Sequence, residues 1–335
     1  MKLHKVEIRN FRCFGAFRVD LVPDVTIFIG KNGSGKSTLI HAIKYGLSFI
    51  FSKDKKVNPN GQSFSASAKG LDMIAFTTTD AKYNMEKHDY CYPVSILCNA
   101  TDTDSSSFGW GLIKENIDKP VSHENYEHAY KRFKDKSEYP VIAIYSDSFP
   151  HVESKITRYA QAILSSGNPI PMNFGYYQWG TDTACTEVWE RRFINVWKEI
   201  LNKTFYAKNK DSVDVLEKEK NTITNYLKKF SNPIFDRPGN DEFCIEDISV
   251  TTRDKKDYLL FHFKNGEDIQ YNNLPSGYRR LFSIVLDVAY RAYLLQLRSL
   301  DNPLFPDFTK EPDEVTGVIV MTKLICIYTQ VYNRK

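Results

Sequence analysis

The glycine-rich segment at residues 30–37 constrains the fold of this chain more than any other feature. It reads GKNGSGKS and fills every position of the pattern GxxxxGK[ST]. The apolar run VTIFI precedes it, and STLIHAIKYGL, with apolar residues at helical spacing, follows it. A strand, a glycine loop and a helix in this order form a P-loop, whose backbone amides and helix dipole bind phosphate oxygens. The segment therefore predicts an α/β fold that binds a nucleoside triphosphate.

Two residues of this loop have further expected roles. Lys36 should reach the β- and γ-phosphates, and the Ser37 hydroxyl should be a ligand of the Mg²⁺ ion that bridges them. A P-loop alone does not distinguish an ATPase from a kinase or a GTPase, and a plain flexible glycine turn is the structural alternative. The residues expected to line the ATP site are Gly30, Lys31, Asn32, Gly33, Ser34, Gly35, Lys36, Ser37 and Thr38.

The rest of the chain alternates between β and helical patterns. Residues 2–29 predict two strands, KVEIRNF and VTIFIG, joined by the turn-rich segment FRCFGAFRVDLVPD. Residues 91–114 predict a small antiparallel β subdomain, and YPVIAIYSD at 139–147 predicts a buried parallel strand. The polar segment 52–70 predicts a surface loop.

The C-terminal half carries the remaining elements. Residues 187–230 predict amphipathic helices of an inserted lobe. A β-hairpin around YLLFHF, KNGED and IQYNNL precedes a long helix that starts at LPSG, and VTGVIV at 315–320 predicts a last buried strand.

Composition limits which partners and which cellular compartment we expect for this chain. The net charge of +4, from 45 basic and 41 acidic residues, is too small to indicate a nucleic-acid partner. Basic runs at 53–56 and 131–136 are typical of a solvated surface. The six cysteines form no CxxC pair, so neither zinc nor a disulfide framework is indicated. No apolar stretch reaches the roughly 20 residues that span a bilayer, so we expect a cytoplasmic protein without a membrane partner.

Two more segments join the P-loop in a family resemblance. IRNFRCF lies just upstream of the loop, the loop itself continues as NGSGKST, and LPSGYRR at 274–280 looks like the signature motif LSGGE or LSGGQ. Together they resemble the ABC-type ATPases of the SMC, RecF and OLD-nuclease class. The resemblance implies that Asn10 and Arg12 lie near the base and phosphates of the nucleotide. It also implies that Ser276 and Gly277 hold the γ-phosphate of ATP on a second protomer, in a head-to-tail homodimer.

The signature segment departs from the family at two positions. Tyr278 and Arg279 stand where the family has Gly and Glu or Gln, which leaves Ser276 and Gly277 as the expected phosphate contacts. Physically, a helix that opens at Ser276 offers amides and a dipole to an anion. The alternative is an ordinary Pro-Ser-Gly turn that caps a core helix.

The segments PVIAIYSD, FGYYQWG and EVWERRFINVW look like those of ATPases from antiphage systems of the Septu and retron-associated type. This resemblance implies a nuclease or reverse-transcriptase effector as partner, a role for DNA as a further partner, and a homodimer or higher oligomer. Gln178 is the candidate Q-loop glutamine, and an exposed loop glutamine without a role is the alternative.

After VTGVIV the family places an Asp-Glu pair, the Walker B acids, which hold Mg²⁺ and orient the attacking water. Here the chain reads MTKLICIYTQVY without an acidic residue. Read from the third base of the Met321 codon, the standard code permits DEIDLHLHPSLQ over twelve codons, and its first Asp is forced. We hypothesise that a one-nucleotide deletion places residues 321–335 out of frame, so that this chain hydrolyses little ATP. A naturally short relative is the alternative.

The expected fold class is an α/β P-loop fold of ABC-ATPase type with an antiparallel β subdomain and an inserted helical lobe. We divide it into an N-terminal ATPase half (1–150), a helical insertion (151–240), a C-terminal ATPase half (241–320) and the tail (321–335). The leading functional hypothesis is an ATPase that dimerises on ATP and controls a DNA-directed or antiphage effector. The alternatives are a nucleotide-binding scaffold without turnover and a RecF-type repair or recombination ATPase. A kinase or GTPase leaves IRNF and LPSG unexplained.

Overall fold

The protein is described here from a computed structural model, and its residues divide into two compact units. Unit 1 contains Met1–Asp147, Tyr176–Asp182 and Asp313–Lys335, and unit 2 contains Ser148–Gly175 and Thr183–Pro312. The structure describes residues 1–22, 25–51, 76–136, 139–145, 156–165, 170–181, 183–206, 210–235, 244–295, 315–321 and 325–330. The surface loop predicted at 52–70 lies outside these ranges.

Unit 1 contains a five-stranded antiparallel sheet in the order β2-β1-β6-β7-β8. Its strands are β1 (Lys2–Phe11), β2 (Phe14–Asp20), β6 (Val94–Thr101), β7 (Ser107–Lys114) and β8 (Ser122–Glu124). Alternate residues of β6 are buried, as expected for a sheet that is covered on one face. The predicted antiparallel subdomain is therefore confirmed, and β1 adds to it.

The strand β2 corrects the prediction for residues 11–24, which treated this segment as a connection. Phe14, Phe17 and Val19 are half-buried, and Ala16, Arg18 and Asp20 are exposed. This alternation is a strand signal, but the glycine at 15 and the Pro-Asp at 23–24 gave a stronger turn signal.

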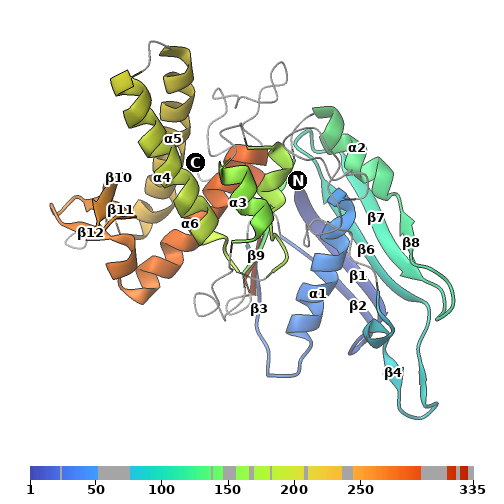
Figure 1. Cartoon of the computed structure of the whole chain (residues 1–335). Coiled ribbons are helices and arrows are strands. Elements are labelled where there is room, and N and C mark those ends of the chain that lie inside the picture. Colours follow the sequence, from blue (N-terminus) through green and yellow to red (C-terminus); the bar gives the residue numbers. More distant parts are fainter. Residues whose placement is uncertain are drawn as a thin grey trace. The chain divides into compact units, whose positions relative to one another are not determined.

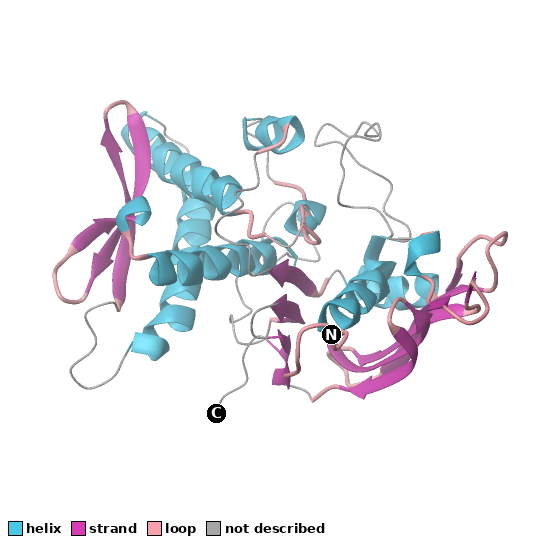
Figure 2. Ribbon diagram, turned by 90° about the horizontal axis from the view of Figure 1, so that it is seen from below, coloured by secondary structure: helices cyan, strands magenta, loops and turns pink. Residues whose placement is uncertain are grey.

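Helices cover the buried face of this sheet, as Figures 1 and 2 show. They are α1 (Lys36–Leu47), η1 (Ser48–Phe51) and α2 (Tyr126–Lys136). The Trp110 indole of β7 donates a hydrogen bond to the Gly46 carbonyl of α1 (2.7 Å), and its ring centroid lies 4.5 Å from that of Phe49. These contacts fix the P-loop helix on the sheet.

A second sheet of unit 1 has the order β3-β14-β13-β9. Its strands are β3 (Val25–Phe28), β9 (Val141–Tyr145), β13 (Thr316–Met321) and β14 (Ile325–Gln330). The strands β13 and β9 are parallel, and every residue of β9 is buried, so the predicted buried parallel strand is confirmed. The strand β14 is antiparallel to both of its neighbours.

Three further small elements lie in the described part of unit 1. They are η2 (Thr78–Asp80), β4 (Tyr83–Asn84) and β5 (Asp89–Tyr90). The short helix η3 (Met172–Tyr176) spans the boundary between the units.

The described residues of unit 2 form four α-helices and a three-stranded sheet. The helices are α3 (Arg158–Ser165), α4 (Thr186–Tyr206), α5 (Lys210–Phe235) and α6 (Ser276–Leu295), with the short helix η4 (Tyr271–Asn273). The strands β10 (Ile245–Arg253), β11 (Lys256–Phe263) and β12 (Asp268–Gln270) form an antiparallel meander. The predicted helical lobe and the hairpin before α6 are thus present.

Buried ion pairs join the helices of unit 2. Asp287 and Arg291 lie one turn apart on α6 and form a fully buried pair at 2.9 Å. Arg192 of α4 contacts both carboxylate oxygens of Glu219 on α5, at 2.8 and 2.7 Å. Such paired charges tolerate burial, whereas removal of one partner would leave an uncompensated charge in the core. Among the helices that the structure describes, none combines the length and apolar character needed to cross a bilayer.

Candidate nucleotide-binding site

The glycine loop leaves β3 and enters α1 at Lys36, as the sequence predicts. Gly33 (φ 83°) and Gly35 (φ 92°) adopt the left-handed conformation, and Gly35 is the N-cap of α1. The first turn of α1 contains no acidic residue. The amides and the positive dipole end of α1 are therefore free of a competing carboxylate from their own turn and suit an anion.

Glycine is required at position 35 by contacts as well as by φ. A Cβ atom there would lie 2.6 Å from Cζ and 2.9 Å from Cε1 of Phe14, on β2. A Cβ atom at Gly30 would meet the Ser34 hydroxyl at 2.7 Å. The loop therefore has the tight backbone path that brings a main chain close to a ligand.

The Lys36 ammonium points back into the loop. Its Nζ donates to the carbonyls of Gly30 (2.6 Å) and Lys31 (2.7 Å) and lies 3.4 Å from the Ser34 hydroxyl. Three donors of an ammonium thus meet acceptors of the loop that it belongs to. The charge of Lys36 is therefore held at the mouth of the loop. Phosphate oxygens are stronger acceptors than carbonyl oxygens, so a bound phosphate would replace the carbonyls as its partners.

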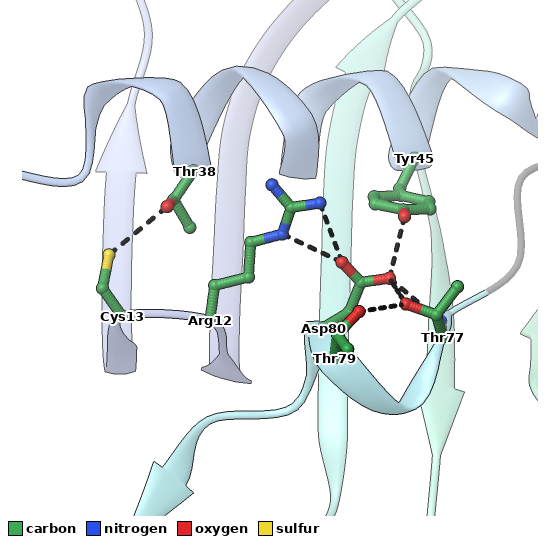
Figure 3. A network of polar contacts seen from close by, with 7 residues as sticks. All are labelled: Arg12, Cys13, Thr38, Tyr45, Thr77, Thr79 and Asp80. Carbon is green, nitrogen blue, oxygen red and sulfur yellow. Dashed lines mark hydrogen bonds and ion pairs between the residues drawn. The ribbon is translucent and has the colours of Figure 1, made fainter.

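Arg12 follows the last residue of β1 and is held by a buried carboxylate, as Figure 3 shows. Its Nε and Nη2 are each 2.9 Å from Oδ1 of Asp80. The other oxygen, Oδ2, accepts from the Tyr45 hydroxyl (2.8 Å) and from the amide and hydroxyl of Thr77 (2.9 and 2.8 Å). Asp80 is 1% exposed, so these contacts replace its hydration.

The surroundings shift the pKa of two members of this cluster. Burial acts to raise the pKa of Asp80, but the hydrogen bonds from Thr77, Tyr45 and Arg12 outweigh it and hold the pKa below its ordinary value. Burial, and then the hydrogen bond to Asp80, raises the pKa of Tyr45 to about 12. At neutral pH the cluster therefore contains a carboxylate and a neutral phenol that donates to it.

The two residues that follow Arg12, Cys13 and Phe14, both lie beside the start of α1. The Cys13 thiol, which is exposed, lies 3.4 Å from the Thr38 hydroxyl. The Phe14 ring packs against Gly35. Arg12 thus lies beside the P-loop helix, and its expected position near the base and phosphates of the nucleotide stays a prediction.

Asn10 has a different partner. Its side-chain amide donates to the Pro93 carbonyl at 3.0 Å, and its φ is 48°. Its expected contact with the nucleotide stays a prediction.

Sequence reasoning missed Asp80 and Phe14 as members of the site. Asp80 is 68 residues from Arg12, so spacing could not pair them. The segment TTTD, which has the form of a capping box, was a local signal for a hydrogen-bonded Asp80.

Ser276 and Gly277 open α6 in unit 2, and both are exposed. The Arg279 amide donates to the Pro275 carbonyl at 2.9 Å, which closes the first turn. A Cβ atom at Gly277 would meet no atom within 4 Å. The helix start is confirmed, and its contact with a phosphate stays a prediction.

Gln178 lies in unit 1 after η3, with φ 49° and a half-buried side chain. Its carbonyl accepts from the amide (3.2 Å) and the hydroxyl (2.9 Å) of Thr181. The Q-loop role of Gln178 stays a prediction. The strand β13 continues through Met321, and residues 322–324 of the tail lie outside the described ranges.

Residues 1–178 match the sequence model of the family described as AAA ATPase domain. The retron Vc95 probable ATPase of Vibrio cholerae serotype O1 biovar El Tor is 23% identical over 344 residues, which cover 91% of this chain and 62% of that protein. The DNA replication and repair protein RecF of Lactococcus lactis subsp. cremoris (strain MG1363) is 38% identical over 45 residues, 13% of this chain and 12% of RecF. The chain therefore spans less than two thirds of these relatives.

Among solved structures, the SMC head domain from Thermotoga maritima aligns with a TM-score of 0.40 and 13% identity, over 97% of this chain and 91% of that one. The recombination mediator protein RecF bound to ATP aligns with a TM-score of 0.36 and 13% identity, over 88% and 81%.

Proposed function

The chain belongs to the AAA ATPase domain family, and on that premise we propose that it binds ATP and Mg²⁺ at Gly30–Thr38, dimerises on ATP and controls an effector. One observation carries the binding proposal. The Lys36 ammonium lies in the mouth of a loop in which Gly33 and Gly35 have left-handed backbones, at a helix start that has no acidic residue in its first turn.

Binding would proceed by exchange of partners. The Lys36 Nζ leaves the carbonyls of Gly30 and Lys31 and donates to phosphate oxygens, which carry formal charge and attract it more strongly. The loop amides and the first turn of α1 receive the remaining phosphate oxygens. The chain's own groups therefore bind and orient the triphosphate.

The hydroxyl oxygens at the start of α1 are suitable ligands for a Mg²⁺ ion. Ser37 is exposed in the first turn, and Thr38 follows it. A hydroxyl oxygen is a ligand that Mg²⁺ accepts together with phosphate oxygens and water. When bound, the ion would neutralise charge on the β- and γ-phosphates. Ser37 would hold it and thereby fix the orientation of the triphosphate.

Dimerisation is the second part of the proposal. The exposed start of α6 at Ser276 and Gly277 supports it, because open space around Gly277 leaves its backbone accessible to a phosphate of another protomer. We propose a head-to-tail homodimer in which each α6 faces the ATP of its partner. We propose a nuclease or reverse-transcriptase effector, as the family resemblance implies. The relative described as a retron probable ATPase supports a retron-associated role, and the short RecF match supports the alternative of a DNA repair role.

Turnover is the third part. Residues 315–335 contain no Asp or Glu, which favours a nucleotide-binding scaffold for the chain as it stands. We propose that the Walker B acids are encoded in the frame that starts at the third base of the Met321 codon. Sequencing the gene beyond the Val320 codon tests this. A frame that lacks DEIDLHLHPSLQ or a close variant would exclude it.

Light scattering of the purified protein tests the proposal as a whole. With ATPγS and Mg²⁺ we expect the mass to change from one chain to two, and with Mg²⁺ alone we expect no change. Phosphate release should be near background for this chain and should appear in a version with the frame restored. ATP binding with an unchanged mass would contradict dimerisation and leave the binding proposal standing.

A further inference from the structure

Asp80 carries a buried charge with a complete set of partners. Its Oδ1 accepts from Nε and Nη2 of Arg12, and its Oδ2 accepts from the Tyr45 hydroxyl and twice from Thr77. A carboxylate with this many donors is fixed in place, because any rotation would break several charge-assisted hydrogen bonds at once. Asp80 is therefore a rigid support for the guanidinium of Arg12.

The backbone ties the same two residues together. The Arg12 amide donates to the Asp80 carbonyl at 2.7 Å, and the Lys82 amide donates to the Asn10 carbonyl at 2.9 Å. Arg12 has a φ of 51°, a conformation that side-chain-bearing residues rarely adopt, so it needs such contacts to persist. The segment 77–82 thus determines both the backbone and the side-chain direction of Arg12.

The free end of the guanidinium lies beside the P-loop helix. Within the described part of the chain, Nη1 of Arg12 makes no hydrogen bond, and the side chain is 33% exposed. Figure 3 shows this nitrogen pointing away from Asp80 toward α1, on the side where Thr38 lies. Cys13, the next residue, contacts Thr38 at 3.4 Å. Arg12 therefore offers a positive charge beside α1, between Thr38 and Tyr45 in Figure 3.

We propose that Asp80 is a positioning residue that holds the Arg12 guanidinium toward the phosphate chain of a nucleoside triphosphate bound at α1. The inference rests on the proposed ATP binding and adds to it the residue that sets the direction of Arg12. Because Asp80 is 1% exposed, it acts through Arg12 rather than by touching the ligand.

The sign of the effect distinguishes positioning from charge. Asp80 partly neutralises Arg12, so by charge alone its removal would strengthen the attraction for a triphosphate. Positioning predicts the opposite, since an Arg12 without its support must be ordered again when the ligand binds. An Asn at position 80 cannot restore the support. It has one acceptor oxygen, which can serve either Arg12 or the donors of Tyr45 and Thr77, and its NH₂ group then faces donors on the other side.

Calorimetric titration with ATPγS and Mg²⁺ tests the inference on the full chain. We expect Asp80→Asn and Arg12→Gln each to raise the dissociation constant about tenfold. In the double variant we expect no loss beyond that of Arg12→Gln, because Asp80 acts through Arg12. Thr77→Ala removes one donor to Oδ2 and keeps the charge, and should raise the constant about threefold.

The chain offers a matched control in Asp102. This buried carboxylate pairs with Arg132 at 3.2 Å in the same unit and accepts from the Ser106 amide. Asp102→Asn should lower thermal stability much as Asp80→Asn does, with the ATPγS dissociation constant within about twofold of the wild type.

Three results would overturn the inference. Unchanged or tighter binding by Asp80→Asn would mean that positioning does not control Arg12. Additive losses in the double variant would mean that Asp80 acts independently of Arg12. If Asp80→Asn does not fold, an unchanged ATPγS dissociation constant for Thr77→Ala would contradict the positioning role of Asp80. A wild-type chain that binds no ATPγS would overturn the proposed function itself, which is a separate outcome.

Discussion

The helices α1 and α6 both begin at a turn that contains glycine, but the two glycines differ in what surrounds them. Gly35 has a φ of 92°, and a Cβ atom there would lie 2.6 Å from the Phe14 ring. At Gly277 φ lies outside the left-handed region, and a Cβ atom would meet nothing within 4 Å. The first glycine is required by the fold, and the second is not.

This difference indicates where each site obtains its shape. The P-loop is shaped by contacts inside unit 1, including Lys36 with its loop carbonyls and Phe14 with Gly35. At the start of α6 the fold itself tolerates a side chain at Gly277, so any requirement for glycine there would come from a ligand or partner. Substitutions at the start of α1 therefore test folding, and substitutions at the start of α6 test association.

The largest effect is expected for Gly35→Ala. The left-handed backbone and the contact with Phe14 should together lower the free energy of unfolding by about 2–4 kcal/mol, and ATP binding should be lost. Gly33→Ala is the matched control. It shares a positive φ of 83° but has open space, so the cost should be about 1 kcal/mol. Urea unfolding measures both. Equal losses would show that the contact with Phe14 is unimportant.

Ser276→Arg should act on association instead. A long cation at the start of α6 would obstruct the approach of a second protomer, so ATP-dependent dimerisation should weaken by at least about tenfold. ATP binding by each chain should stay within about twofold of the wild type, because Ser276 is exposed and lies in the other unit. Ser276→Ala is the control for the loss of the hydroxyl. Light scattering and calorimetry separate the two effects, and an unaltered dimer would argue against the proposed geometry.

Alkaline unfolding compares the tyrosines that hold the two helices. Tyr45 of α1 donates to Asp80, and Tyr271, just before α6, contacts the Ser283 hydroxyl. Burial is the main cause that raises the pKa of each to about 12. A raised pKa gives stability that is present below about pH 10 and is lost as the pH rises toward about 12.

We therefore expect Tyr45→Phe and Tyr271→Phe each to flatten this alkaline loss by about 1 kcal/mol. Thermal unfolding at about pH 8 and pH 11 measures the slope. A variant that loses as much stability as the wild type over this range would show that its tyrosine does not titrate as inferred.

Gly277→Ala should have the smallest effect. Alanine favours a helix more than glycine does, so the free energy of unfolding should change by less than about 0.5 kcal/mol or rise slightly. If dimerisation weakens while stability is kept, the need for glycine lies at the association surface. A loss of more than about 1 kcal/mol in the monomer would contradict the comparison between the two turns.

The sequence was sufficient for elements whose signal is local. The strand, glycine loop and helix around residues 30–37 follow from a contiguous motif, and the start of α6 follows from LPSG. The parallel strand β9 was identified by its run of β-branched and apolar residues. Each of these is decided by neighbours in the chain.

Contacts between distant residues could not be predicted in the same way. The strand β2 carries glycine and charged residues, so its pairing with β1 overrode a turn-like sequence. Asp80 meets Arg12 across 68 residues, and no spacing rule connects them. The role of Phe14 against Gly35 likewise depends on the fold of β2 beside α1.

The central claim is that Gly30–Ser37 binds ATP through Lys36, and one measurement tests it most directly. Calorimetric titration with ATP and Mg²⁺ should show that Lys36→Ala raises the dissociation constant by more than about thirtyfold, because the ammonium donates to the phosphates. Lys31→Ala is the control. It removes a positive charge from the same loop but keeps the carbonyl that accepts from Lys36, and should raise the dissociation constant by less than about threefold. Equal constants for Lys36→Ala and the wild type would contradict the account.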